Sequence, residues 1–254
     1  MSWRTNEDMI YLISDIHGMY YTLKKLLDKI TLLDNTPSFV FIGDYVDGGL
    51  HVFQVIEELI SLQEEGHVVL RGNHEEAFDW FVNDRSAGSI LFSKHKAMSS
   101  IHEFGFDKTL ASYGILNHNK HNKLLEQFKL AVPQSHKEFI RSLPVFWKNE
   151  THFACHAFMN PACQPDFSLT PKNIYKSINM DFNISEMHHS INWDKIGVFG
   201  HISGRKYKLK YPYKISNIRI IDDGGIYGEK LIAYCSDTDE FISEPISRED
   251  LKYS

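Results

Sequence analysis

The sequence SFVFIGDYVDGG, residues 38–49, joins an apolar run to a glycine-bounded turn that carries Asp44 and Asp47. The run from Phe39 to Ile42 is typical of a strand in the interior of a protein. Aspartate and glycine are also common in ordinary surface turns, because aspartate hydrogen-bonds its own backbone and glycine adopts positive φ. The turn alone therefore leaves two interpretations open, a surface turn or a site that uses both carboxylates.

The first 80 residues repeat this arrangement, with an apolar run followed each time by an amphipathic segment. The apolar runs are MIYLIS (9–14), SFVFIGD (38–44) and HVVLRGN (67–73). The amphipathic segments are YYTLKKLLDKITLL (20–33), HVFQVIEELISLQEEG (51–66) and EEAFDWFVND (75–84). Strands that alternate with helices predict βαβ units in a parallel sheet. Ligands of such sheets bind at the carboxyl ends of the strands.

The remainder of the chain is expected to contain a helical part and then a β part. Residues from about 84 to 145 predict mostly helical, polar structure, an insertion within a single domain that spans residues 1–254. Five short apolar runs then predict strands: HFACHAF (152–158), KIGVFGHI (195–202), NIRIIDD (217–223), KLIAYCSD (230–237) and EFISEP (240–245). The fold class is therefore α/β.

The composition is that of a folded globular chain, with 43% hydrophobic and 24% charged residues. The net charge of 27 − 33 = −6 comes without a dense basic cluster, which argues against a nucleic-acid-binding surface. No window approaches the roughly 20 apolar residues of a membrane span, and the amino terminus lacks a secretion signal. Three cysteines at unpatterned spacing indicate free thiols. We expect a cytoplasmic protein without nucleic-acid or membrane partners.

Five predicted strands end at residues that can bind a metal ion. The motifs are SDIHG (14–18), GDYVDGG (43–49), RGNHEE (71–76), CHAF (155–158) and FGHISG (199–204). Their oxygen and imidazole ligands form the mixed set that manganese, iron or zinc accepts: Asp15, His17, Asp44, Asn73, His156 and His201. Two ions about 3.5–4 Å apart would need a bridging carboxylate, and Asp44 is the candidate.

Each motif alone is a weak signal. An Asp-x-His pair is usually structural, single histidines such as His156 and His201 are usually core or loop residues, and Glu75 could be a helix-start acid. The ordered set is specific because every motif falls at the end of a predicted strand.

With these motifs the chain resembles the phosphoprotein-phosphatase family of dinuclear metallophosphoesterases, especially its small bacterial and phage members. The resemblance also covers TLASYG (109–114), FIRSLPVFW (139–147) and IDDGGIYGEKLIAY (221–234). It implies a calcineurin-like α-β-β-α sandwich, in which mixed central sheets are flanked by helices.

The resemblance further implies two divalent ions, with manganese foremost and iron, zinc or cobalt as alternatives. It assigns Asp15, His17 and Asp44 to one ion, and Asp44, Asn73, His156 and His201 to the other. A hydroxide shared by the ions would attack phosphorus in line. His74 would protonate the leaving oxygen, and Asp47 would orient His74 and raise its pKa.

One departure from the family concerns phosphate binding. Where the family has an arginine that grips the phosphate after its second aspartate, this chain has Gly48. The family's Trp-x-Arg segment is also missing, since the chain reads INWDKIG (191–197). Arg71, directly before the Gly-Asn-His-Glu motif, and Arg205 are the candidate substitutes.

We therefore expect a metal-dependent phosphatase that hydrolyses phosphomonoesters, foremost phosphoserine and phosphothreonine in proteins. The substrate would be a phosphorylated protein or a small phosphate ester. A hydrolase of dinucleoside polyphosphates is the alternative, although Glu75 and the VDGG sequence favour the protein phosphatases. Gly48 alone suggests a third reading, a non-catalytic binding module stabilised by metal.

Overall fold

A computed structural model of the chain describes residues 9–83, 105–116, 121–159, 165, 178–179, 193–202, 212–225 and 228–251. Two five-stranded sheets dominate this structure, and a small pair of strands, β6 (Phe158–Met159) and β7 (Ile178–Asn179), accompanies them. No helix among the described residues is long and apolar enough to cross a membrane.

The first sheet contains the predicted βαβ units. Its strand order is β12-β11-β1-β2-β3. The strands are β1 (Ile10–Ile13), β2 (Ser38–Phe41), β3 (Val68–Val69), β11 (Lys230–Cys235) and β12 (Glu240–Pro245). Strands β1, β2 and β3 are parallel, and β11 and β12 extend the sheet with antiparallel pairings. Helices α1 (Tyr20–Thr31) and α2 (Val52–Glu64) are the crossovers, which confirms the predicted alternation.

The second sheet comes from the β part of the chain. Its strand order is β4-β5-β8-β10-β9. The strands are β4 (Phe146–Lys148), β5 (His152–Cys155), β8 (Ile196–Phe199), β9 (Tyr213–Ile215) and β10 (Ile218–Ile220). Strands β5, β8 and β10 are parallel to one another, whereas β4 and β9 are antiparallel edges.

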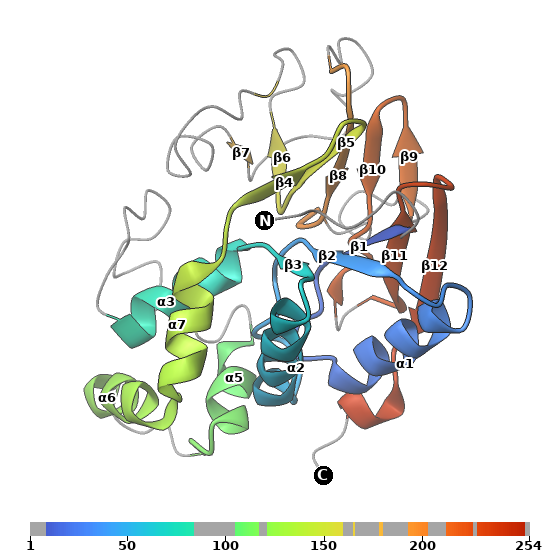
Figure 1. The fold of residues 1–254 in the computed structure, drawn as a ribbon. Helices are drawn as coiled ribbons and strands as arrows, with labels where there is room; N and C mark the ends of the chain where they lie inside the picture. Colours follow the sequence, from blue (N-terminus) through green and yellow to red (C-terminus); the bar gives the residue numbers. More distant parts are fainter. Residues whose placement is uncertain are drawn as a thin grey trace.

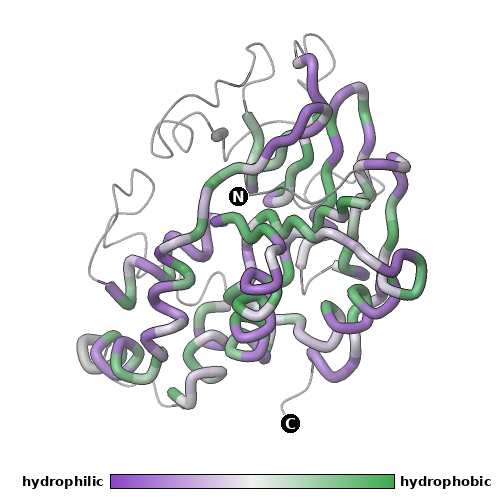
Figure 2. The backbone as a smooth tube through the Cα atoms, viewed as in Figure 1, coloured by the Kyte–Doolittle hydropathy of each residue, from purple (hydrophilic) through white to green (hydrophobic). Residues whose placement is uncertain are grey.

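The apolar runs are continuous because both faces of the first sheet are buried. Tyr11 and Ile13 of β1 pack into the core beneath the helices, while Leu12 between them packs into the layer between the sheets. That layer also receives Ala154 of β5 and Val198 of β8 from the second sheet. Figure 2 shows hydrophobic segments at the centre of the molecule, whereas hydrophobic and hydrophilic residues alternate along the helices.

Helices cover the first sheet on the face opposite the second sheet, as Figure 1 shows. Besides α1 and α2 they are α3 (Asn73–Asn83), α5 (Phe106–Ser112), α6 (His121–Ala131) and α7 (Gln134–Ser142). This arrangement of mixed central sheets flanked by helices is the predicted fold class. The last three helices lie within the predicted insertion, although residues 84–104 and 117–120 are outside the described part. Their Phe106, Phe128 and Phe139 join the core beneath the first sheet.

The carboxyl-terminal segment fixes the start of α1. Met19 precedes this helix and offers no side-chain cap. Asp250 of the 3-10 helix η3 (Arg248–Leu251) replaces the cap. It accepts hydrogen bonds from the Tyr21 N–H (3.0 Å), the Thr22 N–H (2.8 Å) and the Thr22 hydroxyl (2.6 Å). Because Asp250 is fully buried, these bonds are shielded from water.

We expect Asp250→Asn to lower the free energy of unfolding by about 1–3 kcal/mol. The amide nitrogen of asparagine would replace one carboxylate oxygen, so a buried N–H group of α1 would lose its acceptor. Urea unfolding in metal-chelating buffer measures the effect as a shift of the midpoint at constant slope. Asp28→Asn, an exposed position on the same helix, is the matched control. Equal midpoints for the two variants would contradict the role of Asp250.

Candidate metal centre

The predicted ligands lie where strands end, in both sheets. Asp15 and His17 follow β1, Asp44 follows β2, and Asn73 begins α3 after β3. His156 follows β5 and His201 follows β8 in the second sheet. Backbone hydrogen bonds join neighbouring ligand loops, for example from the His17 N–H to the Asp44 carbonyl (3.0 Å). The carboxyl ends of the two sheets therefore meet at one place.

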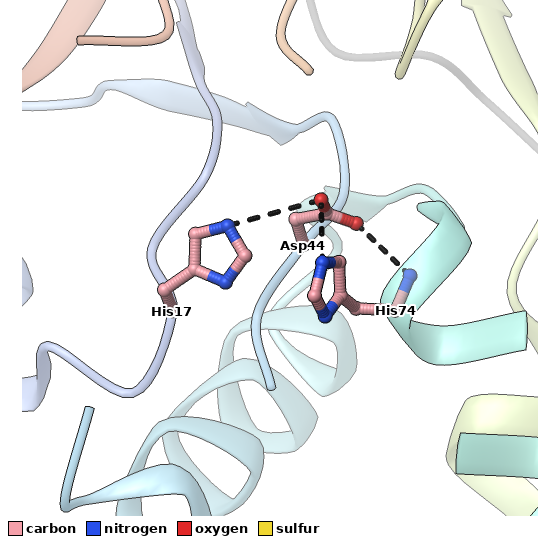
Figure 3. A group of neighbouring side chains, drawn as sticks. All are labelled: His17, Asp44 and His74. Carbon is pink, nitrogen blue, oxygen red and sulfur yellow. Dashed lines mark hydrogen bonds and ion pairs between the residues drawn. The ribbon is translucent and has the colours of Figure 1, made fainter. Parts of the chain in front are cut away.

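Asp44 lies at the middle of this group. Its Oδ2 is 3.1 Å from Nε2 of His156, 3.7 Å from Nε2 of His74 and 3.8 Å from Nε2 of His17. Figure 3 shows the rings of His17 and His74 beside each other, each with one nitrogen directed toward the Asp44 carboxylate. Two sets of ligand atoms each lie within 4.8 Å of one another, namely His17, Asp44 and His74, and Asp44, His156 and His201.

The orientation of two histidine rings suits metal binding. Nδ1 of His17 is 3.0 Å from the Val46 carbonyl, and Nδ1 of His156 is 3.0 Å from the Ile42 carbonyl. Since a carbonyl only accepts, each Nδ1 carries a hydrogen, so that a ring in its neutral form would present the lone pair of Nε2 toward the centre. These donors, with buried carboxylate and amide oxygens, match the ligand chemistry of divalent manganese, iron or zinc.

Asn73 and Asp15 lie beside these sets. The Asn73 side-chain oxygen is 3.0 Å from Nε2 of His156, so it shares that half of the site. Both oxygens of Asp15 accept the His201 N–H at 3.2 Å. Burial and repulsion from Asp222 raise the pKa of Asp15 well above its usual value. A nearby cation would relieve this cost by favouring the ionised carboxylate.

His74 and Asp47, the two candidate catalytic residues, form a buried pair. Nδ1 of His74 is 2.6 Å from Oδ2 of Asp47. Burial lowers the pKa of His74, but attraction to Asp44 and the hydrogen bond with Asp47 outweigh it and raise the pKa to about 10. The imidazolium therefore directs its Nε2–H toward Asp44. The position of Nε2 suits a metal ligand as well as a proton donor.

Backbone conformation sets these residues apart from the rest of the chain. Seven non-glycine residues in the described part have positive φ, and five of them are predicted site residues: Asp15 (57°), His17 (43°), Asp44 (59°), Asp47 (68°) and His201 (62°). Left-handed backbone costs energy for residues with a side chain, and such strain concentrates at functional sites. The motifs do not reveal this feature, because it depends on the folded loops.

Glu75 has a structural role that its place in the sequence does not show. Its fully buried Oε2 accepts the N–H groups of Asp44 (2.8 Å) and Gly72 (2.9 Å). Oε1 accepts the N–H of Tyr45 (2.7 Å). One carboxylate thus ties the Asp44 loop to the start of α3. Gly72 permits this approach, since a Cβ there would lie 2.2 Å from Oδ1 of Asp44.

The structure corrects the expected phosphate role of Arg71. Its guanidinium donates to Glu76 (2.7 Å) and to the carbonyls of Ile140 (2.7 Å) and Arg141 (2.9 Å). The side chain is 8% exposed, so these bonds hold α3 and α7 together. Arg205, the other candidate, lies outside the described residues.

A sequence profile of the family described as calcineurin-like phosphoesterases matches residues 9–223. The chain belongs to this family. It is therefore a metallophosphoesterase, a hydrolase of phosphate esters. The ligand groups around Asp44 are consistent with a family that uses two divalent metal ions.

Relatives of this phosphoesterase include two kinds of phosphatase. The asymmetrical bis(5'-nucleosyl)-tetraphosphatase PrpE of Oceanobacillus iheyensis is 25% identical over 92% of this chain and 91% of its own length. The serine/threonine-protein phosphatase 2B catalytic subunit A2 of Saccharomyces cerevisiae is 41% identical, but over only 26% of this chain and 11% of its own length.

Solved structures share the fold. One described as a candidate diadenosine tetraphosphatase has a TM-score of 0.64 and 18% identity, and the match covers 97% of both chains. A protein serine/threonine phosphatase from Saccharomyces cerevisiae has a TM-score of 0.50 and 15% identity, over 96% of this chain and 81% of that chain. At these identities the likeness concerns the fold and not the substrate.

Metal affinity of this phosphoesterase should depend on pH through His156. Burial lowers the pKa of His156 in the metal-free protein, but attraction to Asp44 outweighs it and raises the pKa to about 9. A metal ion must displace that proton, so we expect Mn²⁺ affinity to rise by about tenfold per pH unit between about pH 6.5 and 8.5. Isothermal titration calorimetry measures the affinity, and buffers of different ionisation enthalpy count the protons released.

His156→Gln should flatten this pH dependence, whereas His67→Gln should leave it unchanged. His67 lies at the amino end of β3, away from the centre. An affinity independent of pH in the unaltered protein would contradict the assignment of His156 as a ligand.

Proposed function

We propose that this phosphoesterase hydrolyses phosphoserine and phosphothreonine in proteins, with His74 as the general acid. The observation that carries the proposal is the 2.6 Å bond between His74 and Asp47 in a buried position beside Asp44. In this pair Asp47 orients the His74 imidazole before substrate binds, and the imidazole can lose a proton and regain it.

The chemistry of the leaving group supports this choice of substrate. An alkoxide that leaves from phosphoserine is a strong base, so its departure requires a proton. The leaving group of a dinucleoside polyphosphate is a nucleotide, whose terminal phosphate has a second pKa of about 6 and departs without protonation. A fixed general acid therefore contributes most to the hydrolysis of alkyl phosphates.

The ligands of the centre have a different task from the acid. Asp15, His17, Asp44, Asn73, His156 and His201 would hold two divalent ions, which when bound would acidify a water molecule and neutralise charge on the phosphate oxygens. Asp47 keeps the hydrogen on Nδ1 of His74, so that Nε2–H faces the centre. As a water oxygen bonds to phosphorus and the ester P–O bond breaks, the Nε2 proton passes to the leaving oxygen and His74 becomes neutral.

A second candidate substrate is a dinucleoside polyphosphate. The full-length similarity to the Oceanobacillus iheyensis bis(5'-nucleosyl)-tetraphosphatase favours it. The similarity to protein phosphatase 2B covers a shorter part of the chain but at higher identity. A direct comparison of substrates separates the two.

We expect the Mn²⁺-loaded protein to have a higher kcat/KM for a phosphothreonine peptide than for diadenosine tetraphosphate. His74→Asn should lower kcat for the peptide by about 10²–10⁴-fold, the range of general acid catalysis. The loss on p-nitrophenyl phosphate should be smaller, because p-nitrophenolate is a weak base. Phosphate release measures the reactions of the peptide and of p-nitrophenyl phosphate, and chromatography of the nucleotide products measures the hydrolysis of diadenosine tetraphosphate.

His67→Asn is the control variant, since His67 is remote from the centre. A preference for the dinucleotide would select the second candidate. Equal losses on peptide and aryl phosphate in His74→Asn would exclude His74 as the acid, and activity on none of the substrates would refute both candidates.

A further inference from the structure

We propose that Thr109 of α5 is a positioning residue, which holds Asp47 and, through it, sets the orientation of His74. The proposal rests on the proposed role of His74 as general acid. It also gives a function to part of the predicted insertion, because Thr109 is distant in sequence from the strand-end motifs and reaches them only in the folded protein.

Thr109 makes two hydrogen bonds to the same aspartate. Its Oγ1 accepts the Asp47 N–H at 2.9 Å, and its hydroxyl donates to Oδ1 of Asp47 at 2.6 Å. The other carboxylate oxygen, Oδ2, faces Nδ1 of His74 at 2.6 Å. Thr109 is fully buried and Asp47 is 4% exposed, so water competes little for these bonds.

The direction of each bond follows from the groups involved. The backbone N–H of Asp47 can only donate, so it occupies a lone pair of the Thr109 oxygen. The hydroxyl hydrogen is then available for the carboxylate, and Oδ1 is engaged. A carboxylate otherwise turns readily about its last torsion. With Oδ1 fixed, Oδ2 stays in the plane that reaches His74.

The same contacts support a strained backbone. Asp47 has a φ of 68°, in the left-handed region that a side chain disfavours. The bond from its N–H to Thr109 holds that conformation, and the Gly48 N–H donates to the Gly105 carbonyl (3.3 Å) immediately before α5. A third bond joins the Phe53 N–H to the Ser112 hydroxyl (2.7 Å). Helix α5 is thus attached to Asp47 and Gly48 at one end of this loop and to Phe53, in the first turn of α2, at the other.

Helix α5 is also fixed relative to the helix that carries His74. The ring of Phe106 on α5 stacks on Phe81 of α3, with centroids 4.5 Å apart and an interplanar angle of 30°. Both aromatic rings are buried. Thr109 and His74 therefore stand on two packed helices, and Asp47 bridges the gap between them.

Substitution of Thr109 by valine tests this role, because valine keeps the shape of threonine and removes the hydroxyl. We expect Thr109→Val to lower kcat for a phosphothreonine peptide by about tenfold to a hundredfold, the effect of a misplaced catalytic group. The loss on p-nitrophenyl phosphate should stay within about threefold, since its leaving group gains little from an acid. Thr109→Ser, which keeps the hydroxyl, should restore the peptide activity.

Thr22→Val is the matched control. Thr22 is equally buried and its hydroxyl also binds an aspartate, but that aspartate is Asp250 of η3 and not Asp47. Both valine variants are expected to lose stability, and only Thr109→Val should change the ratio of peptide to aryl phosphate activity. An equal loss on both substrates, or a failure of serine to rescue, would overturn the proposal.

A second measurement does not depend on activity. The hydrogen on Nδ1 of His74, bonded to Asp47, should give a downfield proton resonance that is absent from His74→Asn. Thr109→Val should shift or broaden this resonance, and Thr22→Val should leave it in place. An unchanged resonance in Thr109→Val would overturn the proposal. If the unaltered protein hydrolyses no phosphate ester, the proposed function fails while the resonance still decides the role of Thr109.

Discussion

The buried carboxylate of Asp44 is the group around which the two sheets are joined. A charge that is 2% exposed is costly unless other charges or hydrogen bonds compensate it. Burial raises the pKa of Asp44, but attraction to His156 and His74 outweighs it and holds the pKa well below its usual range. His74 lies in α3, after strand β3 of the first sheet, and His156 follows strand β5 of the second sheet. In the metal-free protein the positive charge of these histidines compensates the Asp44 carboxylate, as divalent cations would in the loaded enzyme. The contact between the two sheets and the metal centre therefore both require positive charge beside Asp44.

The loops that carry the candidate ligands are held by hydrogen bonds to their backbone and not by packing alone. Asp44 has a left-handed φ of 59°, and its N–H donates a hydrogen bond to the Glu75 carboxylate. Asp47 has the same kind of backbone and is held by Thr109. Such strained backbone conformations persist only where several contacts with the surrounding structure hold them. The carboxylates can therefore point inward before any ion or substrate binds, which reduces the reorganisation required during reaction.

The sequence predicted the strands and the ligand loops because both follow from local patterns. A run such as Phe39–Ile42 is apolar at every position, since alternate residues enter the two cores on either side of the sheet. The role of Thr109 could not be predicted, because its partner Asp47 is 62 residues away and no periodicity links the two. Arg71 was misjudged for a related reason. Its place before the Gly-Asn-His-Glu motif suggested phosphate binding, but its side chain turns to α7, whose carbonyls it satisfies.

Gly48 has a structural explanation that the comparison with phosphatase motifs lacks. Its φ is 77°, and a Cβ on the neighbouring Gly105 would lie 2.7 Å from the Gly48 nitrogen. Gly105 thus allows α5 to approach the loop closely enough for Thr109 to reach Asp47, and Gly48 supplies the positive φ of the loop at this contact. A side chain at position 48 would adopt a left-handed backbone at a cost of about 1–2 kcal/mol. Position 48, which lacks the arginine of the family motif, lies in the contact between this loop and α5. Under the proposed function, that contact helps Thr109 to hold Asp47 beside His74.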